Sequence, residues 1–379
     1  MRKIMITKMR RRINIIISGG GTGGHVFPAI AIADALREKD ESINVLFVGA
    51  KHKMEMERVP AAGYSIEGLP VTGFYRGFGF KNISFFYNLF ISMIKAGKIV
   101  DNFAPDVVVG VGGYASGPVV RAAASRKIPV LIQEQNSYAG VTNRILAGKA
   151  DIICVAYEGM ERYFPPGKII ITGNPVRNDL TDLTGKREEA AAYFGIRGDK
   201  KVILVIGGSL GAGNINAGIS GNIQKIRESG LEMIWQTGKR GYKDARELTG
   251  SEVPAGIHIC EFISRMDLAY ALADLVISRA GAGTISELCL TGKPAILVPS
   301  PNVAEDHQTR NAMALVEKDA AVIVKDADTT TKLVPAAIDL AGDALRLGEL
   351  KRNISAMALP GSASRIADEI FKLVNKYKS

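Results

Sequence analysis

Short apolar runs alternate with amphipathic segments along the first half of the chain. Ile13–Ser18 is a mostly apolar run that predicts a strand, and the segment from Pro28 to about Lys39 has one apolar face and predicts a helix. Apolar strands that alternate with helices are typical of a parallel sheet whose two faces are both covered. Further strands are predicted at Asn44–Gly49, Val107–Gly110, Val130–Gln133, Ile152–Val155 and Ile169–Thr172.

The same pattern starts again at Lys201. Val202–Ile206 predicts a strand, a glycine-rich turn follows it, and a helix is expected from about Asn214. We therefore predict an α/β protein with two doubly wound, Rossmann-like domains, residues 1–174 and 175–355, and a closing helix in 356–379 that could pack back on the N-terminal domain. Later strands are expected at Met233–Gln236, Ile257–Cys260, Leu275–Ser278, Ala295–Val298 and Ala321–Val324.

The length and charge of the chain narrow the kinds of partner. Its 379 residues suffice for two domains, and 47 % apolar and 23 % charged residues are typical of a globular protein. The net charge of +10 suits nucleic acid, an anionic membrane or a phosphorylated substrate. Nucleic acid is the least favoured, because the chain has no recognition-module signature and no basic block interleaved with aromatic residues.

Cysteine usage and the lengths of the apolar segments indicate the compartment. Cys154, Cys260 and Cys289 lie far apart and form no C-x-x-C, so neither a disulfide framework nor a zinc site is indicated, and a reducing cytoplasm is expected. No uninterrupted apolar stretch reaches the ~18–20 residues that span a bilayer. We expect a protein that does not cross a membrane.

The first glycine loop, Gly19–Gly24, lies between a predicted strand and a predicted helix. Its letters match the G-x-G-x-x-G dinucleotide fingerprint, which also requires an acidic residue at the end of the next strand. That strand ends in Val48–Lys51 without a carboxylate, which argues against NAD or FAD. The loop remains suited to a phosphate, because glycines let a ligand approach the backbone and a helix N-terminus carries partial positive charge.

Two more glycine-rich turns occur in the second half. Gly207–Gly213 adds the hydroxyl of Ser209 and suits a diphosphate, although it lacks the Gly-Lys-Ser/Thr ending of a Walker A motif. Ser278–Thr284 precedes a helix that carries Glu287, whose carboxylate could accept hydrogen bonds from both hydroxyls of a ribose. Alternatively, Glu287 only stabilises the dipole of its helix.

Seven motifs occur in order along the chain. Together they closely resemble the MurG family of UDP-N-acetylglucosamine transferases, which complete lipid II, and the match runs from about residue 13 to residue 370. Each motif alone is weakly specific, whereas seven in register are strong. They are Gly19–Pro28, Gly112–Pro118, Glu134–Asn136, Gly173–Arg177, Gly207–Ala212, Ser278–Glu287 and Asp306–Ala312.

The resemblance implies a GT-B fold with the active site in the cleft between the domains and UDP-N-acetylglucosamine held mainly by the C-terminal domain. By position, Glu287 matches the ribose ligand and Ile263 matches a uracil contact made through the backbone. Many relatives have Gln at the positions of Leu210 and His307, so side-chain contacts differ there. The implied donor-binding residues are Thr22, Gly23, Asn136, Arg177, Ser209, Ile263, Thr284, Glu287, His307 and Gln308.

The resemblance also implies that the N-terminal domain binds the acceptor, lipid I, a muramyl sugar linked to undecaprenyl diphosphate. Asn136 is expected on this side of the cleft although it is counted among the donor contacts. The acceptor-binding residues implied are Gly21, Gly24, Tyr114 and Asn143, and the catalytic candidates are His25 and Glu134.

The expected reaction is an inverting displacement in which the 4-hydroxyl of the muramyl sugar attacks the anomeric carbon of the donor as UDP leaves. His25 is our first choice of general base and Glu134 is the alternative, while His25 could instead orient the acceptor diphosphate as a cation. The Gly207–Gly213 amides and Arg177 are expected to stabilise the leaving diphosphate without a cofactor or a metal ion. The rival metal site, Asp326–Asp328, precedes a predicted helix, where capping is the favoured role.

Aromatic and basic residues gather in the segment Phe74–Val100. This combination favours the headgroup boundary of a membrane, whereas the alternative is a core helix. We predict peripheral attachment to the cytoplasmic face of the bacterial cell membrane through Phe78, Phe80, Ile83, Phe86 and Phe90.

Four other functions fit parts of the pattern. A UDP-N-acetylglucosamine 2-epimerase or a glycolipid glucosyltransferase would share the architecture, but the His25 loop and Gly112–Pro118 accompany the muramyl acceptor. A non-catalytic sugar-nucleotide-binding subunit would need the motifs of only one half of the chain, so the presence of complete motif sets in both halves disfavours it. An NAD-linked oxidoreductase is disfavoured by the missing carboxylate.

Overall fold

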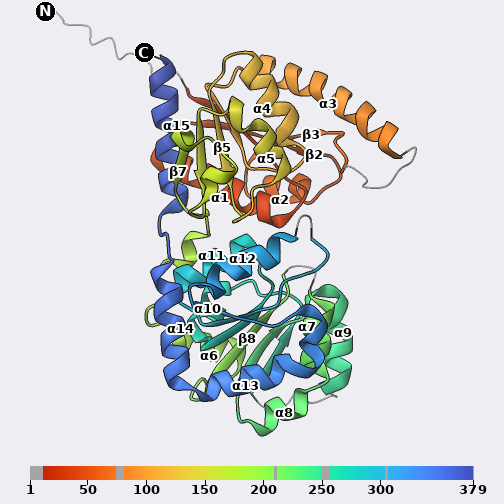
Figure 1. The fold of residues 1–379 in the computed structure, drawn as a ribbon, viewed down its shortest axis with the longest axis vertical. Coiled ribbons are helices and arrows are strands. Elements are labelled where there is room, and N and C mark those ends of the chain that lie inside the picture. The colour runs from red at the N-terminus through yellow and green to blue at the C-terminus, as the bar shows by residue number, and fades with distance from the viewer. Residues whose placement is uncertain (1–11, 74–80, 209–210, 250–255, 304–305, 379) are drawn as a thin grey trace, which may run out of the picture. The chain divides into compact units, whose positions relative to one another are not determined.

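The computed structural model describes residues 12–73, 81–208, 211–249, 256–303 and 306–378, and these form two compact units (Figure 1). Unit 1 contains the described residues up to Gln135, Ala139–Pro175 and those from Gly361 onward, and unit 2 contains Asn136–Tyr138 and Val176–Pro360. The chain therefore leaves unit 1 for three residues after Gln135. It enters unit 2 again at Val176, stays there to Pro360 and returns to unit 1 for its closing helix.

Unit 1 is built on a seven-stranded parallel sheet with the order β3-β2-β1-β4-β5-β6-β7. The central strand β1 pairs with β2 and β4, which places Ile16 beside Leu46 and Val108. The strands are β1 Asn14–Ser18, β2 Asn44–Ala50, β3 Ser65–Leu69, β4 Val107–Gly110, β5 Val130–Glu134, β6 Ile152–Val155 and β7 Ile169–Ile171.

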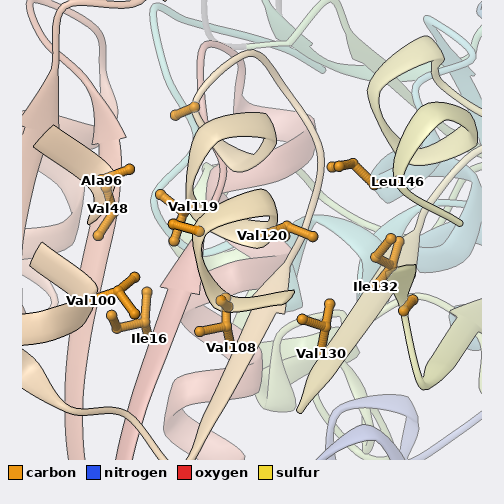
Figure 2. Close-up of a cluster of buried hydrophobic side chains, with 14 of the residues drawn as sticks. Ile16, Val48, Ala96, Val100, Val108, Val119, Val120, Val130, Ile132 and Leu146 are labelled. Atoms are coloured by element: carbon orange, nitrogen blue, oxygen red, sulfur yellow. The ribbon is translucent and has the colours of Figure 1, made fainter. Parts of the chain in front are cut away.

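Helices cover both faces of this sheet, as the uninterrupted apolar strands predicted. One core joins α3 and α4 to side chains such as Ile16, Val108 and Ile132 (Figure 2). The other joins α1 and α15 to alternate residues of the same strands, such as Ile15 and Ile17. The helices are α1 Gly23–Lys39, α2 Glu55–Ala61, α3 Lys81–Phe103, α4 Ser116–Ser125, α5 Val141–Leu146 and α15 Ser362–Lys378, with 3₁₀ turns at Ala147–Lys149, Met160–Arg162 and Pro166–Lys168.

Unit 2 repeats the plan with a six-stranded parallel sheet in the order β10-β9-β8-β11-β12-β13. Its strands are β8 Val202–Ile206, β9 Glu232–Gln236, β10 Ile257–Cys260, β11 Leu275–Ser278, β12 Ala295–Leu297 and β13 Val322–Ile323. Its helices are α6 Arg187–Phe194, α7 Gly213–Ser220, α8 Ile223–Glu228, α9 Gly238–Thr249, α10 Met266–Leu272, α11 Ala282–Thr291, α12 His307–Val316, α13 Val334–Gly342 and α14 Ala344–Ala356. Shorter helical turns are Asn178–Leu180, Asp326–Asp328 and the π-helical Thr329–Leu333.

The predicted fold class, with two doubly wound parallel sheets, is confirmed, and two local predictions were wrong. Strand β3 was missed, because Ser65–Leu69 is an edge strand that pairs only with β2 and alternates polar with apolar residues. Helix α1 begins at Gly23 rather than near Pro28, so Pro28 lies inside the helix and His25 lies in its first turn.

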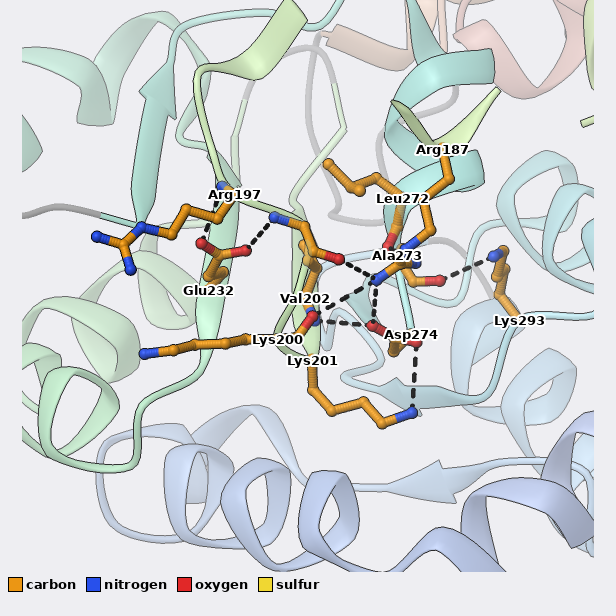
Figure 3. Close-up of polar contacts among 11 residues, drawn as sticks. Arg187, Arg197, Lys200, Lys201, Val202, Glu232, Leu272, Ala273, Asp274 and Lys293 are labelled. Atoms are coloured by element: carbon orange, nitrogen blue, oxygen red, sulfur yellow. Dashed lines mark hydrogen bonds and ion pairs between the residues drawn. The ribbon is translucent and has the colours of Figure 1, made fainter. Parts of the chain in front are cut away.

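A polar cluster lies at the amino ends of the strands of unit 2 (Figure 3). Asp274 accepts hydrogen bonds from the Val202 amide at 2.9 Å and from Arg187 at 3.3 Å. The nearby Lys293 donates to the Ala273 carbonyl at 2.8 Å, and burial lowers the pKa of its ammonium group to about 8. Because ligands of open α/β sheets bind at the carboxyl ends of the strands, we assign this cluster a structural role.

Candidate active site

Two glycine turns of unit 1 pack backbone against backbone after the neighbouring strands β1 and β4. A Cβ atom on Gly19 would lie 2.8 Å from the carbonyl oxygen of Gly112. Gly113 has φ +81°, and a Cβ atom there would collide with the backbone of Gly20. Only glycine permits this approach. Tyr114, which follows the second turn, is 53 % exposed.

His25 faces the second of these turns. Its Nδ1 lies 3.2 Å from the hydroxyl oxygen of Thr22, and a Cβ atom on Gly112 would lie 3.0 Å from its Nε2. The same Cβ position is 3.7 Å from Nδ2 of Asn143. The structure therefore brings His25 and Asn143 to the same stretch of backbone.

Glu134, the second catalytic candidate, ends β5 and is 1 % exposed. Its Oε2 accepts hydrogen bonds from Asn143 Nδ2 at 2.8 Å and from the Gly140 amide at 3.0 Å. The buried Oδ1 of Asn143 has no hydrogen-bond partner among the described residues. Because buried acceptors are rarely left unpaired, this oxygen is available to a hydroxyl or amide of a ligand.

The first glycine loop is hydrogen-bonded to Glu55, a residue that the sequence analysis did not single out. Gly21, with φ +88°, donates its amide hydrogen to both carboxylate oxygens of Glu55 at 3.0 Å. Thr22 is the N-cap residue of α1 without a side-chain cap bond, and Gly23 and Gly24 are the first residues of the helix. The amide of Gly21 is therefore engaged within the protein.

In unit 2, Glu287 lies one and a half turns into α11. The Tyr270 hydroxyl donates to its Oε2 at 3.0 Å, and Nε of Arg177 lies 3.9 Å from its Oε1. Burial raises the pKa of Glu287, while Arg177 and the Tyr270 hydrogen bond oppose that rise. Arg177 also lies 3.6 Å from Asp179, and Thr284 is partly exposed in the first turn of α11. The predicted ribose carboxylate and the predicted diphosphate arginine are thus neighbours.

The second glycine loop is supported by Gln236 at the end of β9. Gln236 Nε2 donates to the carbonyl oxygen of Gly208 at 2.9 Å, and its Oε1 accepts the Ile263 amide at 3.2 Å. One buried carboxamide therefore joins the predicted diphosphate loop to the predicted uracil contact. Ser209 and Leu210 lie outside the described residues.

Asn136 belongs to unit 2, whereas the sequence placed it in the N-terminal domain. Its Oδ1 accepts a hydrogen bond from Nδ2 of Asn311 in α12 at 3.1 Å. The Asn311 Oδ1 in turn accepts the amide of Ser137 at 3.0 Å. These bonds attach residues 136–138 to α12.

His307 and Gln308 begin α12. The His307 ring lies 6.0 Å from the ring of Tyr138, and Gln308 Oε1 accepts the amide of Ser300 at 2.8 Å. The guanidinium group of Arg310 lies over the Tyr138 ring, 4.0 Å from its centre. In this structure Gln308 therefore orders the loop that precedes its own helix.

The Asp326–Asp328 triplet does not act as predicted. Asp328 is the N-cap residue of the next helical turn, but its side chain makes no cap bond and pairs with Lys332 at 3.0 Å. Asp326 pairs with Arg279, which also donates to the Val298 carbonyl at 3.1 Å. The capping prediction was therefore wrong, because both carboxylates pair with basic side chains. Within the described part of the chain, no group of three or more His, Cys, Asp or Glu side chains could hold a metal ion.

Helix α3 has two unlike faces. Phe86 and Phe90 are 62 % and 63 % exposed, and Tyr87 and Ile94 share their face. Residues 92, 96, 99 and 100 are buried on the opposite face. Phe78, Phe80 and the side chain of Ile83 lie outside the described residues. Within the ranges that the structure covers, no helix is both long and apolar enough to span a bilayer.

Four residues that support these sites were not predicted individually. Asn311 lies inside a motif that was recognised, whereas Gln236 and Tyr270 act through contacts that are distant in sequence. Glu55 follows β2, but it comes five residues after Ala50, later than the dinucleotide fingerprint places its acid.

Both halves of the chain match known families. The glycosyltransferase family 28 N-terminal domain matches residues 15–155, and the family 28 C-terminal domain matches residues 202–366. The UDP-N-acetylglucosamine–N-acetylmuramyl-(pentapeptide) pyrophosphoryl-undecaprenol N-acetylglucosamine transferase of Parabacteroides distasonis is 56 % identical over 366 residues, covering 97 % of this chain and 100 % of the relative. The transferase of the same name from Phocaeicola vulgatus is 54 % identical over 98 % of this chain and 99 % of its own.

A solved structure agrees with these relatives. The crystal structure of Acinetobacter baumannii MurG superposes with a TM-score of 0.76 at 29 % identity and covers 95 % of this chain and 99 % of the other. The chain therefore belongs to glycosyltransferase family 28 and, within it, to the MurG family of N-acetylglucosamine transferases, which have the GT-B fold.

Proposed function

We propose that the protein transfers N-acetylglucosamine from UDP-N-acetylglucosamine to the 4-hydroxyl of the muramyl sugar of lipid I, giving the β-1,4-linked disaccharide of lipid II in peptidoglycan synthesis. The observation that carries the proposal is identity of 56 % to a transferase of this name over nearly the whole chain. The residues around His25 in unit 1 and around Glu287 in unit 2 support it, because they supply a candidate base, a candidate ribose acceptor and, in Arg177, a diphosphate ligand.

Unit 2 binds the donor in this proposal. Glu287 accepts hydrogen bonds from the ribose hydroxyls, with its carboxylate oriented by Tyr270. Arg177, beside Glu287, binds the diphosphate with its planar guanidinium group, and Ile263 contacts the uracil through its backbone. The remaining donor contacts proposed in unit 2 are Asn136, Ser209, Thr284, His307 and Gln308, and unit 1 adds Thr22 and Gly23.

Unit 1 binds the acceptor through Gly24, Tyr114, Asn143 and the part of Gly21 other than its amide, whose hydrogen bond Glu55 accepts, and it supplies the general base. His25 removes the proton of the attacking hydroxyl as the new glycosidic bond forms and the bond to UDP breaks. The contact of its Nδ1 with the Thr22 hydroxyl at 3.2 Å orients the ring for this role. Glu134 is the weaker candidate, because its Oε2 already accepts two hydrogen bonds that hold Asn143 and Gly140.

The negative charge that develops on the leaving diphosphate is stabilised by Arg177 and the amides of the second glycine loop, without a divalent ion. Labelled donor and a lipid I analogue test the whole proposal: wild-type protein gives a labelled disaccharide, and chelation of divalent ions leaves its yield unchanged. Absence of the disaccharide refutes the transfer, and loss on chelation with recovery on adding metal refutes the metal-free mechanism.

The exposed face of α3 attaches the protein to the cytoplasmic face of the membrane, where the lipid acceptor lies. Phe86 and Phe90 on one face of a helix, in a chain of net charge +10, support monotopic binding to anionic lipid. Vesicles that contain anionic lipid should retain the wild type and lose the Phe86→Glu/Phe90→Glu variant. A matched control is Leu345→Glu, at a single exposed leucine of α14. Equal retention of all three proteins would refute attachment through α3.

A further inference from the structure

Glu55, the first residue of α2, is a buried carboxylate that binds backbone amides. It is 1 % exposed. Both of its oxygens accept the amide hydrogen of Gly21 at 3.0 Å, and Oε1 also accepts that of Ala50 at 2.9 Å. Hydrogen bonds to a charged group are stronger than neutral ones, so these contacts hold the first glycine loop against the end of β2.

The backbone around Glu55 is shaped to admit it. A Cβ atom on Gly20 would collide with Oε1 of Glu55, and one on Gly49 would lie 2.6 Å from its Cγ. Gly20 also has φ +147°, which disfavours any other residue. Two glycines on different segments therefore leave room for one side chain.

The hydrogen-bond pattern resembles that of a bound anion. Amides of a glycine loop that precedes a helix are the groups with which such loops hold phosphate. Here the Gly21 amide points to a carboxylate of the protein itself. A phosphate that approached Gly21 would lack this donor and would meet a fixed negative charge.

We infer that Glu55 is a positioning residue for the transfer reaction. Its carboxylate occupies the position at which the amide of such a glycine loop would bind a phosphate. It thereby fixes the loop, so that His25 stays beside Gly112. The inference rests on the role proposed above for His25. It gives this loop a supporting task in place of the nucleotide binding that its letters suggest.

The test compares Glu55→Gln with the matched control Glu57→Gln, an exposed position of the same helix. The carboxamide of Glu55→Gln replaces one of the two oxygens that accept the Gly21 amide with an N–H group, so we expect kcat to fall about tenfold or more. The donor KM should stay within about twofold, because the proposed uracil and ribose contacts, Ile263 and Glu287, lie in unit 2. Glu57→Gln should match the wild type in both constants.

Thermal unfolding separates positioning from a purely structural role, which would lower Tm and leave kcat intact well below Tm. Unchanged kcat in Glu55→Gln, or an equal loss in Glu57→Gln, would overturn the inference. If the wild type makes no disaccharide, the proposed function fails and the role of Glu55 in transfer fails with it, and amide exchange then tests only whether Glu55 anchors the loop. The same measurement decides if Glu55→Gln does not fold. Protection of the Gly21 and Ala50 amides in the wild type supports the inference, and exchange at the rate of a free chain overturns it.

Discussion

The first glycine loops of the two units have similar sequences but different supports. In unit 1 the carboxylate of Glu55 accepts a hydrogen bond from the Gly21 amide. This contact occupies an amide donor of the loop and places a negative charge beside it. In unit 2 the neutral carboxamide of Gln236 donates a hydrogen bond to the Gly208 carbonyl. This contact occupies a carbonyl acceptor of the loop, uses none of its amide donors and adds no charge. Since phosphate needs amide donors and repels carboxylates, the second loop is the better diphosphate site. The side chain that hydrogen-bonds to the backbone of a glycine loop therefore decides what the loop can bind.

The largest expected effect separates the chemistry of unit 1 from the donor binding of unit 2. His25→Ala removes the proposed base, so kcat should fall by roughly 10²–10⁴ while donor affinity stays unchanged. Steady-state kinetics and donor titration measure the two quantities. His52→Asn, at an exposed turn with φ +61°, is the control and should behave like the wild type. Wild-type turnover in His25→Ala would remove His25 from the mechanism.

The next effect falls on unit 2. Glu287→Gln replaces a charged acceptor of the ribose hydroxyls with a neutral one, so the donor KM should rise roughly 10–100-fold with the acceptor KM unchanged. Tyr270→Phe keeps the carboxylate but removes the hydroxyl that orients it at 3.0 Å, and should give a smaller change in the same direction. An acceptor KM that rises with the donor KM would contradict this division between the units.

Gln236→Glu tests the comparison of the loops directly. It puts a carboxylate behind the second loop, as Glu55 lies behind the first, and loses the hydrogen bond to Gly208. The donor KM should rise about tenfold, because the added charge repels the diphosphate. Gln236→Ala removes the support without adding charge and should have the smaller effect. Equal effects of the two variants would show that charge behind the loop does not matter.

Most of the fold followed from the apolar runs, because strands of a sheet covered on both faces are apolar along their length. The strands β4, β6, β8, β10 and β11 have the predicted bounds. The edge strand β3 has no such run, since it lies half exposed. Helix α1 starts earlier than predicted because its first two residues are glycines, which have low intrinsic helix propensity.

The candidate site was less predictable than the fold. The motifs placed His25 after a glycine loop and Glu287 on a helix after a glycine turn, but local sequence says nothing about partners that come from other elements. Tyr270 reaches Glu287 from α10, and Glu55 reaches Gly21 from α2. The crossing of residues 136–138 into unit 2 depends on the side chain of Asn311, 175 positions beyond Asn136. Such contacts follow only from the folded backbone.

The smallest expected effect on activity belongs to the amino ends of the strands in unit 2. Burial lowers the pKa of Lys293 to about 8 from its ordinary 10.5, so between these values the unfolded chain binds more protons than the folded one. The free energy of unfolding therefore rises as pH increases from about 8 toward 10.5. It falls again as pH decreases through this range to about 8, where Lys293 becomes protonated in the folded protein too. In urea unfolding, the free energy of unfolding of the wild type, relative to that of Lys293→Met, should increase by about 2 kcal/mol between pH 7 and pH 10.

Comparing the two proteins cancels titrations that they share, such as that of the Cys260 thiol, whose pKa burial raises to about 11. Transfer activity at pH 7 should be equal in both, since Lys293 lies at the amino end of β12, away from Gln236 at the carboxyl end of β9 and from Glu287 in α11. A stability difference that stays constant with pH would show that the Lys293 ammonium is not desolvated. A loss of activity in Lys293→Met without a loss of stability would place chemistry at the amino ends, against the division on which the comparison of the two loops depends.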